Sequence, residues 1–476
     1  MKYIWIITFS IVLLVSSISF VKLNEPLFLS GEEVYKTYCA GCHGANMEGN
    51  LAESLIKSEW TYGASRNLIF RNIKFGIPNT EMVAWESFLS DNAINKVVDY
   101  VIESQEIPPH KERIIPGEIE TKDYQIKVEV LVEEGIKAPW AIEFVNKNTA
   151  LITEKHGGLK WMKNGVLDTQ RIAGLPVPYT KSSTAGLMDI ALDPHYKQNG
   201  WIYLAFSHTD EEIDERGSLS MTKVIRGRIH GYQWLDEETL FEADESLRVE
   251  KGNRWGCRLL FDKEGKLYFS IGDMGRADDS QDLTKVTGKV FRINSDGTIP
   301  NDNPFVKDPD AISGIFTYGN RNVQGLALHP ATGEIWATEH GPMGGDELNI
   351  LEKGKNYGWP VITYGLDYDG DEVSSNTHQK GMEQPIEQWT PSIAICPSEF
   401  STSKLFPNWK NDLFVGALAF EEIRRLDIKK NEVVDQEIIL KGYGRVRDLK
   451  FGPDGALYVL LNKPDKVLRL SPINGI

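Results

Sequence analysis

Short segments in which two apolar stretches flank a polar turn recur along the chain after residue 124, and this recurrence restricts the fold more than any other feature. The clearest copies begin near residues 141, 189, 258, 325 and 448, as in VQGLALHPATGEIWATEHG and VRDLKFGPDGALYVLLN. Each copy alternates apolar and polar residues, breaks at Asp, Gly or Pro, and alternates again, which is the pattern of strand, turn and strand. The last gap is about twice the others, and NDLFVGALAFEEIRRLDI occupies it.

Six such units predict an all-β six-bladed β-propeller over residues 124–476. A pair of β-sandwiches and a β-helix are the alternatives. The repeat is too long for the rungs of a solenoid, and long loops between the units are typical of the upper face of a propeller. We therefore expect ligands to bind where the loops and inner strand ends surround the central axis.

The preceding segment, residues 24–105, has a helical pattern and contains CAGCH at residues 39–43. Two thiols two residues apart, followed at once by a histidine, are the signature of covalent haem c attachment. Cys39 and Cys42 would bind the haem vinyl groups and His43 the iron. A zinc site is disfavoured because no second CxxC or HxxxH follows. The segment resembles class I cytochrome c, which implies a small all-α cytochrome c domain with a methionine as the other iron ligand.

Met82 is the expected iron ligand because it lies in the loop before the last helix, whereas Met47 follows the haem motif too closely. The last helix is expected over SDNAINKVVDYVIES, with Ser90 or Asp91 as its cap. Residues 106–123 are rich in proline and charge and are predicted to be a linker.

Residues 1–23 have one lysine followed by a largely apolar stretch, which predicts a signal peptide or an uncleaved membrane anchor. Haem c is attached outside the cytoplasm, so a periplasmic or exported protein, with a possible membrane tether, is expected. The net charge of −16 argues against a nucleic acid partner. Of the four cysteines, Cys257 and Cys396 remain as buried apolar residues or one disulfide.

Three arginines recur at corresponding places in the repeats. Arg321 lies beside Asn322 in YGNRNVQG, and Arg445 and Arg447 are two apart in GRVRDLKF, so the latter pair share one face of a strand. Guanidinium groups bind carboxylates in a bidentate manner. Their convergence near the axis of an acidic protein predicts an anion site.

Several stretches, among them YGNRNVQGLALHP, GEIWATEHGPMGGDELNIL, GKNYGWPVITYG and RVRDLKFGPDGALYVL, resemble the PQQ-dependent soluble sugar dehydrogenases of the aldose sugar dehydrogenase type. The resemblance covers the whole predicted propeller. It implies that PQQ, a planar quinone with three carboxylates, lies over the axis and that calcium activates it for hydride removal from a sugar. The residues that match its cofactor site are Arg321, Asn322, Arg445 and Arg447 for PQQ, His340 beside it, the carbonyl groups of Gly341 and Pro342 for calcium, and Glu347 and Tyr357 for a second calcium.

The chain departs from that family at the position of its catalytic base, where the family has a histidine. Arg254 occupies this position, and Asp273 occupies the position of the carboxylate that orients the histidine. Arginine stays protonated in proteins and cannot act as a conventional base. Another residue, His340 or Asp273, would then serve as the base, or Arg254 binds an acidic sugar, or the propeller only binds a ligand. Thr184 replaces a family glutamine, and Ala419 replaces a lysine found in some members.

The leading hypothesis is an oxidoreductase that oxidises a sugar or sugar-like alcohol at PQQ with calcium and passes electrons to its own haem. A downstream cytochrome or membrane oxidase would then accept the electrons. The alternative is a non-catalytic, haem-tethered ligand-binding propeller that has lost the catalytic base. A lactone hydrolase is disfavoured, because such propellers usually place carboxylates for calcium where this chain places arginines.

Overall fold

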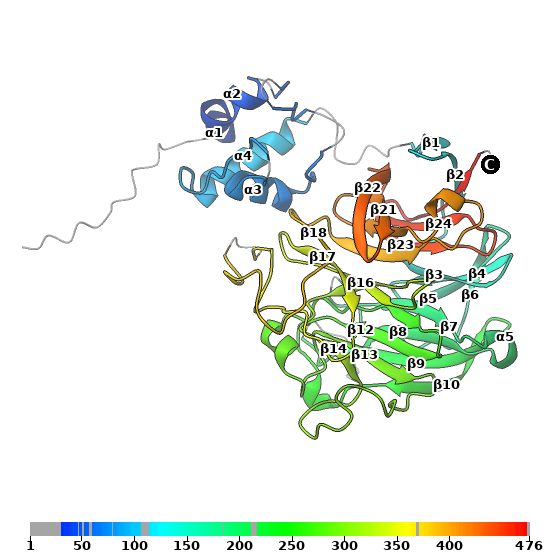
Figure 1. Cartoon of the computed structure of the whole chain (residues 1–476). Coiled ribbons are helices and arrows are strands. Elements are labelled where there is room, and N and C mark those ends of the chain that lie inside the picture. The colour runs from blue at the N-terminus through cyan, green and yellow to red at the C-terminus, as the bar shows by residue number, and fades with distance from the viewer. Residues whose placement is uncertain are drawn as a thin grey trace, which may run out of the picture.

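The computed structural model describes residues 30–45, 47–49, 52–56, 60–78, 80–105, 114–182, 184–210, 217–367 and 371–473. It contains a small helical domain, blue in Figure 1, and a ring of β-sheets coloured cyan to red. The predicted signal peptide or anchor, residues 1–23, lies outside the described residues. Over the described part of the chain, no helix is long and apolar enough to span a membrane.

The helical domain is built from four helices, which are α1 (Gly31–Tyr38), α2 (Ala40–His43), α3 (Arg66–Phe75) and α4 (Asp91–Glu103). Ser30 and Glu33 form a reciprocal capping box at the start of α1, and Ser90, not Asp91, caps α4. The buried faces of α1, α3 and α4 share one apolar core that includes Val34, Ile69 and Val97. The predicted cytochrome c domain is therefore present as a small helical fold.

Six antiparallel sheets form the second domain, and they confirm the predicted six-bladed β-propeller. The first three blades are β3 (Pro139–Asn146), β4 (Thr149–Glu154), β5 (Gly158–Lys163) and β6 (Val166–Arg171); β7 (Leu187–Leu192), β8 (Ile202–His208), β9 (Met221–His230) and β10 (Gln233–Phe241); and β11 (Leu259–Phe261), β12 (Lys266–Ile271), β13 (Lys289–Asn294) and β14 (Ile315–Tyr318). Two further blades are β15 (Val323–Leu328), β16 (Ile335–Glu339), β17 (Asp346–Leu351) and β18 (Glu387–Trp389); and β19 (Ile395–Phe400), β20 (Leu413–Ala417), β21 (Glu422–Lys429) and β22 (Glu432–Lys441). Short helical turns in the connections are α5 (Tyr196–Asn199), η1 (Glu245–Leu247), η2 (Ala277–Gln281) and η3 (Pro407–Trp409).

The last blade joins the two ends of the propeller. Its strands are β23 (Arg445–Phe451), β24 (Leu457–Asn462) and β25 (Lys466–Pro472), extended by β2 (Gln125–Val132) and β1 (Glu118–Glu120). Val128 of β2 pairs with Leu470 of β25, so backbone hydrogen bonds close the ring. β1 lies inside the predicted linker, residues 106–123, so the sheet structure begins at Glu118 rather than after residue 123.

The innermost strands of the blades converge on one buried guanidinium, that of Arg258, just before β11. It donates to Asp448 of β23 at 3.0 Å and lies 3.4 Å from Asp189 of β7. It also donates to the carbonyl oxygens of Gln324 and Arg447, both at 2.7 Å. One ionic group thus ties four blades together beneath the face where the site residues gather.

Candidate functional site

The haem motif lies at the junction of α1 and α2. The amides of Cys42 and His43 both donate to the carbonyl of Cys39, at 3.1 and 3.0 Å. This helical turn brings residues i, i+3 and i+4 to one side, as binding of one haem requires. Nδ1 of His43 lies 3.1 Å from the carbonyl oxygen of Glu53, so an N–H at Nδ1 leaves the Nε2 lone pair for iron.

Met82 lies on the segment between α3 and α4 and is half-buried against the core that includes Cys39 and Ala40. Backbone bonds from Ile77 to the carbonyl of Met82 (3.0 Å) and from Trp85 to that of Ile73 (3.2 Å) fix this segment on α3. Met47 is 2% exposed and packs into the same core. Met82 and Met47 thus both lie at this core, and Met82 as the second iron ligand stays a prediction.

The predicted anion site contains three arginines whose guanidinium groups have no carboxylate partner. Arg321 donates to the carbonyl groups of His340 (3.0 Å) and Gly341 (2.8 Å), and Arg445 to that of Leu418 (3.1 Å). Arg447 lies 4.1 Å from the Trp140 ring. Within the described residues, these three form no ion pair, and we call them the arginine cradle.

The cradle surrounds His340, which follows β16. Burial lowers the pKa of His340 to about 3, and the charges of all three cradle arginines contribute, so all three act on this one imidazole. Its buried Nε2 has no hydrogen-bond partner, and neither has the Nε of Arg321. Such unpaired buried groups are costly and typically mark a ligand site.

Asn322 supports this region rather than presenting a free amide. Its Oδ1 accepts from the amide of Gly256 at 3.1 Å, and its Nδ2 lies 3.4 Å from Nδ1 of His340. These two contacts explain why the Asn322 side chain is buried. A direct bond from Asn322 to the cofactor stays a prediction. Asn322 holds the loop after Arg254 against the strand that carries His340.

Arg254 and Asp273 contact each other directly. Nε of Arg254 donates to Oδ1 of Asp273 at 2.6 Å. The carboxylate is fully buried, and it also accepts from Nε1 of Trp359 (2.9 Å) and the amide of Gly275 (3.0 Å). Asp273 therefore has no free lone pair directed at a substrate, which makes it a poor candidate for the catalytic base. Arg254 has a φ of +56° and its amide donates to Oγ1 of Thr184 at 3.2 Å.

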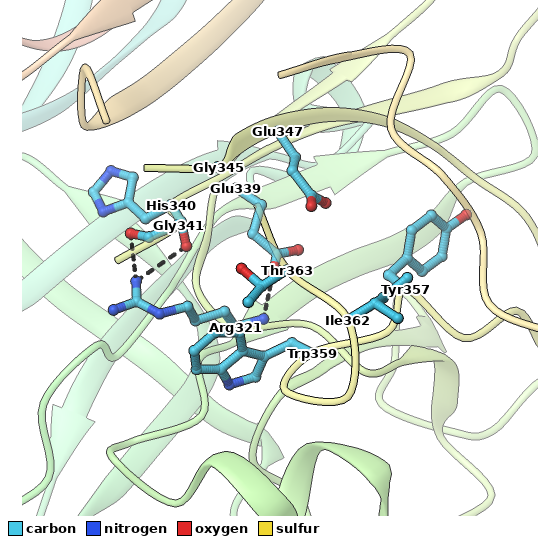
Figure 2. A pocket seen from close by; sticks show the side chains of 10 residues that line it. All are labelled: Arg321, Glu339, His340, Gly341, Gly345, Glu347, Tyr357, Trp359, Ile362 and Thr363. Carbon is cyan, nitrogen blue, oxygen red and sulfur yellow. Dashed lines mark hydrogen bonds between the residues drawn. The ribbon is translucent and has the colours of Figure 1, made fainter. Parts of the chain in front are cut away.

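Glu339 and Glu347 face each other across β16 and β17 beside a pocket that Arg321, His340, Tyr357 and Trp359 also line (Figure 2). Burial raises the pKa of Glu347 to about 8, with the charge of Glu339 as a further cause. Burial also raises the pKa of Glu339 to about 7. Two carboxylates held together with no cationic side chain on Glu347 are a donor set for a hard cation such as calcium.

The other predicted calcium ligands are constrained by their neighbours. The Tyr357 hydroxyl donates to the carbonyl of Ile350 at 2.6 Å and accepts from the amide of Glu352 at 2.9 Å, so only its main-chain carbonyl remains as a ligand. The carbonyl of Gly341 already accepts from Arg321, and Pro342 is buried beside it.

Two features of this region were not predicted from the sequence. Trp359 and Glu339 lie in stretches quoted for their family resemblance, but nothing local marks them as partners of Asp273 and Glu347. The Arg258 cluster could have been noticed, because charged residues interrupt the apolar strands in CRLLFD, LMDIAL and VRDLKF. Of the two alternatives that the sequence left open for Cys257 and Cys396, the structure shows the first, because both are buried free thiols.

Comparisons with known proteins agree with this division of the chain. Residues 136–469 match the family described as Glucose / Sorbosone dehydrogenase, and residues 26–101 match Cytochrome C oxidase, cbb3-type, subunit III. The chain is 36% identical to the aldose sugar dehydrogenase YliI of Escherichia coli, over 73% of this chain and 94% of that protein. It is 31% identical to quinoprotein glucose dehydrogenase B of Acinetobacter calcoaceticus, over 59% of this chain and 74% of that protein.

A solved structure of the soluble aldose sugar dehydrogenase from Escherichia coli, in the apo-form, superposes with a TM-score of 0.67 at 34% identity. The superposition covers 73% of this chain and 99% of that one. The part of the chain outside it contains the helical domain with the haem motif.

Proposed function

The chain belongs to the glucose/sorbosone dehydrogenase family and carries an N-terminal cytochrome c domain of the cbb3 type, and from this premise we propose that it is a quinohaemoprotein sugar dehydrogenase. It would oxidise a sugar or sugar-like alcohol at PQQ with calcium and pass the electrons to its own haem c. An external cytochrome or membrane oxidase would accept them next. Export to the periplasm, with or without a membrane tether, suits this chemistry and remains part of the proposal.

The observation that carries the proposal is the arginine cradle. Guanidinium groups that are buried without a counter-ion are unfavourable, because burial removes water from the charge. Arg321 is 3% exposed and Arg447 is 9% exposed, and burial lowers the pKa of Arg447 to about 10. A bound polycarboxylate supplies the missing negative charge, and PQQ has three carboxylates for three arginines.

The chemistry of the donors supports both groups that the family implies, although a calcium ion at Gly341 would share that carbonyl oxygen with Arg321. Arg321, Arg445 and Arg447 would hold PQQ, with Asn322 positioning His340. The carbonyl groups of Gly341 and Pro342 would hold one calcium ion, and Glu347 with the carbonyl of Tyr357 a second. When bound, PQQ supplies a two-electron acceptor for hydride from the sugar, and calcium makes its carbonyl more electrophilic.

Of the predicted catalytic residues, His340 would accept the substrate proton, provided that the carboxylates of bound PQQ offset the three arginine charges that lower its pKa. Its Nε2 has no partner, whereas Asp273 is fully used by Arg254, Trp359 and Gly275. Arg254 keeps outward N–H groups, since its side chain is 24% exposed. These donors would orient hydroxyl or carboxylate oxygens of the substrate, which keeps acidic sugars such as uronates among the candidates.

The test is haem reduction in the full chain. Apo-protein is supplied with PQQ and calcium, then with a panel of neutral sugars and sugar acids, while the reduced haem band is followed. Reduction that requires PQQ and substrate together supports the proposal, and Arg447→Met should abolish it. Arg228→Met is the matched control, because this arginine is in a surface ion pair with Asp236 at 3.0 Å.

The second candidate, a non-catalytic haem-tethered binding propeller, is favoured by one observation, the arginine at the family's histidine position. It predicts PQQ binding without haem reduction for every substrate in the panel. If PQQ binds but no substrate reduces the haem, the binding-protein hypothesis replaces the dehydrogenase proposal.

A further inference from the structure

We propose that the turn Leu418–Glu421 of the propeller is the docking surface for the chain's own cytochrome domain, with Phe420 as the residue that positions the haem for electron transfer. The inference rests on the proposed function and deepens it, because it names where electrons leave the propeller. Figure 1 shows the helical domain beside the blade that carries this turn, near β18 and β22.

The contact is apolar and close. Leu68 of α3 and Phe420 are each 7% exposed, and they belong to one buried cluster with Trp389 and Ile393 of the propeller. A Cβ built on Gly63 would lie 2.8 Å from Cε1 of Phe420 and 2.5 Å from Cδ1 of Leu68. Any larger residue would push these two side chains apart, and the φ of +83° at Gly63 also favours glycine.

The cytochrome side of the contact is fixed to the haem-binding core. Nδ2 of Asn72, on α3, donates to the carbonyl of Tyr62 at 3.1 Å and holds the turn that contains Gly63. The opposite face of α3 packs into the core with Ile69 and Ile73. The carbonyl of Ile73 accepts from the amide of Trp85 at 3.2 Å, on the segment that carries Met82. One helix therefore contacts both the propeller and the segment of the expected iron ligand.

The propeller side of the contact is fixed to the arginine cradle. The amide of Leu418 donates to the carbonyl of Ala394 at 2.9 Å, and that of Ala419 to Ile393 at 3.0 Å. The carbonyl of Leu418 accepts from Arg445 at 3.1 Å. Two residues further on, Phe420 lies against the cytochrome domain. The cradle and the haem domain are thus joined by a single short turn, with no intervening blade.

The electrons balance through this contact. Oxidation of one alcohol or hemiacetal releases two electrons and two protons. The haem takes one electron at a time, from Fe(III) to Fe(II), so two transfers occur per sugar. A one-electron acceptor outside the chain reoxidises the haem between them. A contact built around one aromatic side chain is small, so a single substitution should disrupt it.

The experiment compares holoprotein of the full chain with Phe420→Ala and Gly63→Ala, one variant on each side of the contact. Stopped-flow absorbance measures haem reduction after mixing with substrate, and an artificial two-electron dye measures sugar oxidation at the propeller alone. We expect haem reduction to slow tenfold or more in both variants, while dye reduction stays within twofold of wild type. Phe420→Leu should restore most of the rate, and Leu235→Ala, at an exposed residue of β10, should change neither rate. Haem reduction at the wild-type rate in Phe420→Ala overturns the proposal.

A second readout does not depend on activity. Hydrogen exchange should show that the turn Trp60–Gly63 of the cytochrome domain is protected in wild type and loses protection in Phe420→Ala, while the amides of Leu418 and Ala419, which are bonded within the propeller, stay protected. If wild type reduces no dye with any sugar, the proposed function fails, and exchange still decides the docking. Loss of protection in the cytochrome turn then supports the contact, and unchanged protection there overturns it.

Discussion

The arginines near the axis of the propeller differ in their partners. The guanidinium of Arg258 is joined to Asp189 and Asp448, whereas the guanidinium groups of the cradle arginines, Arg321, Arg445 and Arg447, contact carbonyl groups, amides and rings but no carboxylate of the described residues. A buried charge with its counter-ions belongs to the fold. A buried charge without counter-ions needs a negatively charged ligand from outside the chain. We therefore assign Arg258 to the stability of the fold and the cradle arginines to ligand binding.

The largest effect on stability is expected from breaking the ion pairs of Arg258. Arg258→Leu leaves two buried carboxylates without a cation, so the free energy of unfolding should fall by about 3–5 kcal/mol. Urea unfolding of the apo-protein measures this change. A loss below about 1 kcal/mol would mean that the cluster contributes little to the fold and that the comparison is wrong.

The next largest effect on stability is expected at the two neighbouring carboxyl groups, those of Glu339 and Glu347. Glu339 and Glu347 lie side by side, and burial raises the pKa of both, so a bound cation would stabilise their ionised forms. Removing calcium with EDTA at a pH above 8 should therefore destabilise the protein. The loss should be about 2.7 kcal/mol if free calcium is a hundred times its dissociation constant.

Glu347→Gln removes one of the two carboxylates and serves as the matched variant. It should lose most of the stabilisation by calcium, and any part that remains would come from the ion proposed at the carbonyl groups of Gly341 and Pro342. Equal stability of the wild-type protein in calcium and in EDTA would contradict the assignment of a metal to these carboxylates.

Arg254 has a carboxylate partner, Asp273, as Arg258 does, but its side chain is partly exposed. Arg254→His restores the family's residue beside the same carboxylate, and kcat/KM for neutral aldoses should rise about tenfold or more, because a positioned base adds to the rate. Steady-state assays with the artificial dye measure this. An intact fold with no gain would show that Arg254 does not stand in the place of the base.

The smallest effect is expected in the cradle itself when no cofactor is present. Arg447→Met removes an uncompensated buried charge together with weak contacts to Gln324 and Asn462, so the stability of the apo-protein should change by less than about 1 kcal/mol. A loss as large as that of Arg258→Leu in the same urea titration would show that the cradle arginines are structural.

The strand alternation and turn residues were enough to predict six blades, because each unit repeats the same local pattern. The sequence also predicted that Arg321, Arg445 and Arg447 lie near one another, because all three stand at the start of the first strand of a blade, Arg321 just before β15 and the other two within β23. Partners that depend on three-dimensional packing were not predictable. Asp189 and Asp448 lie far along the chain from Arg258, and Phe420 meets Leu68 across two domains. The residues of β1 were assigned to the linker because one isoleucine between two glutamates is too short a stretch to show strand periodicity.

Calorimetric titration of PQQ into the apo-protein tests the central claim most directly, that unpaired buried arginines hold a polycarboxylate cofactor. We predict one PQQ per chain, bound more weakly as salt increases, with an affinity that falls about a hundredfold or more in Arg447→Met. Equal affinity in the variant and the wild type would contradict the claim.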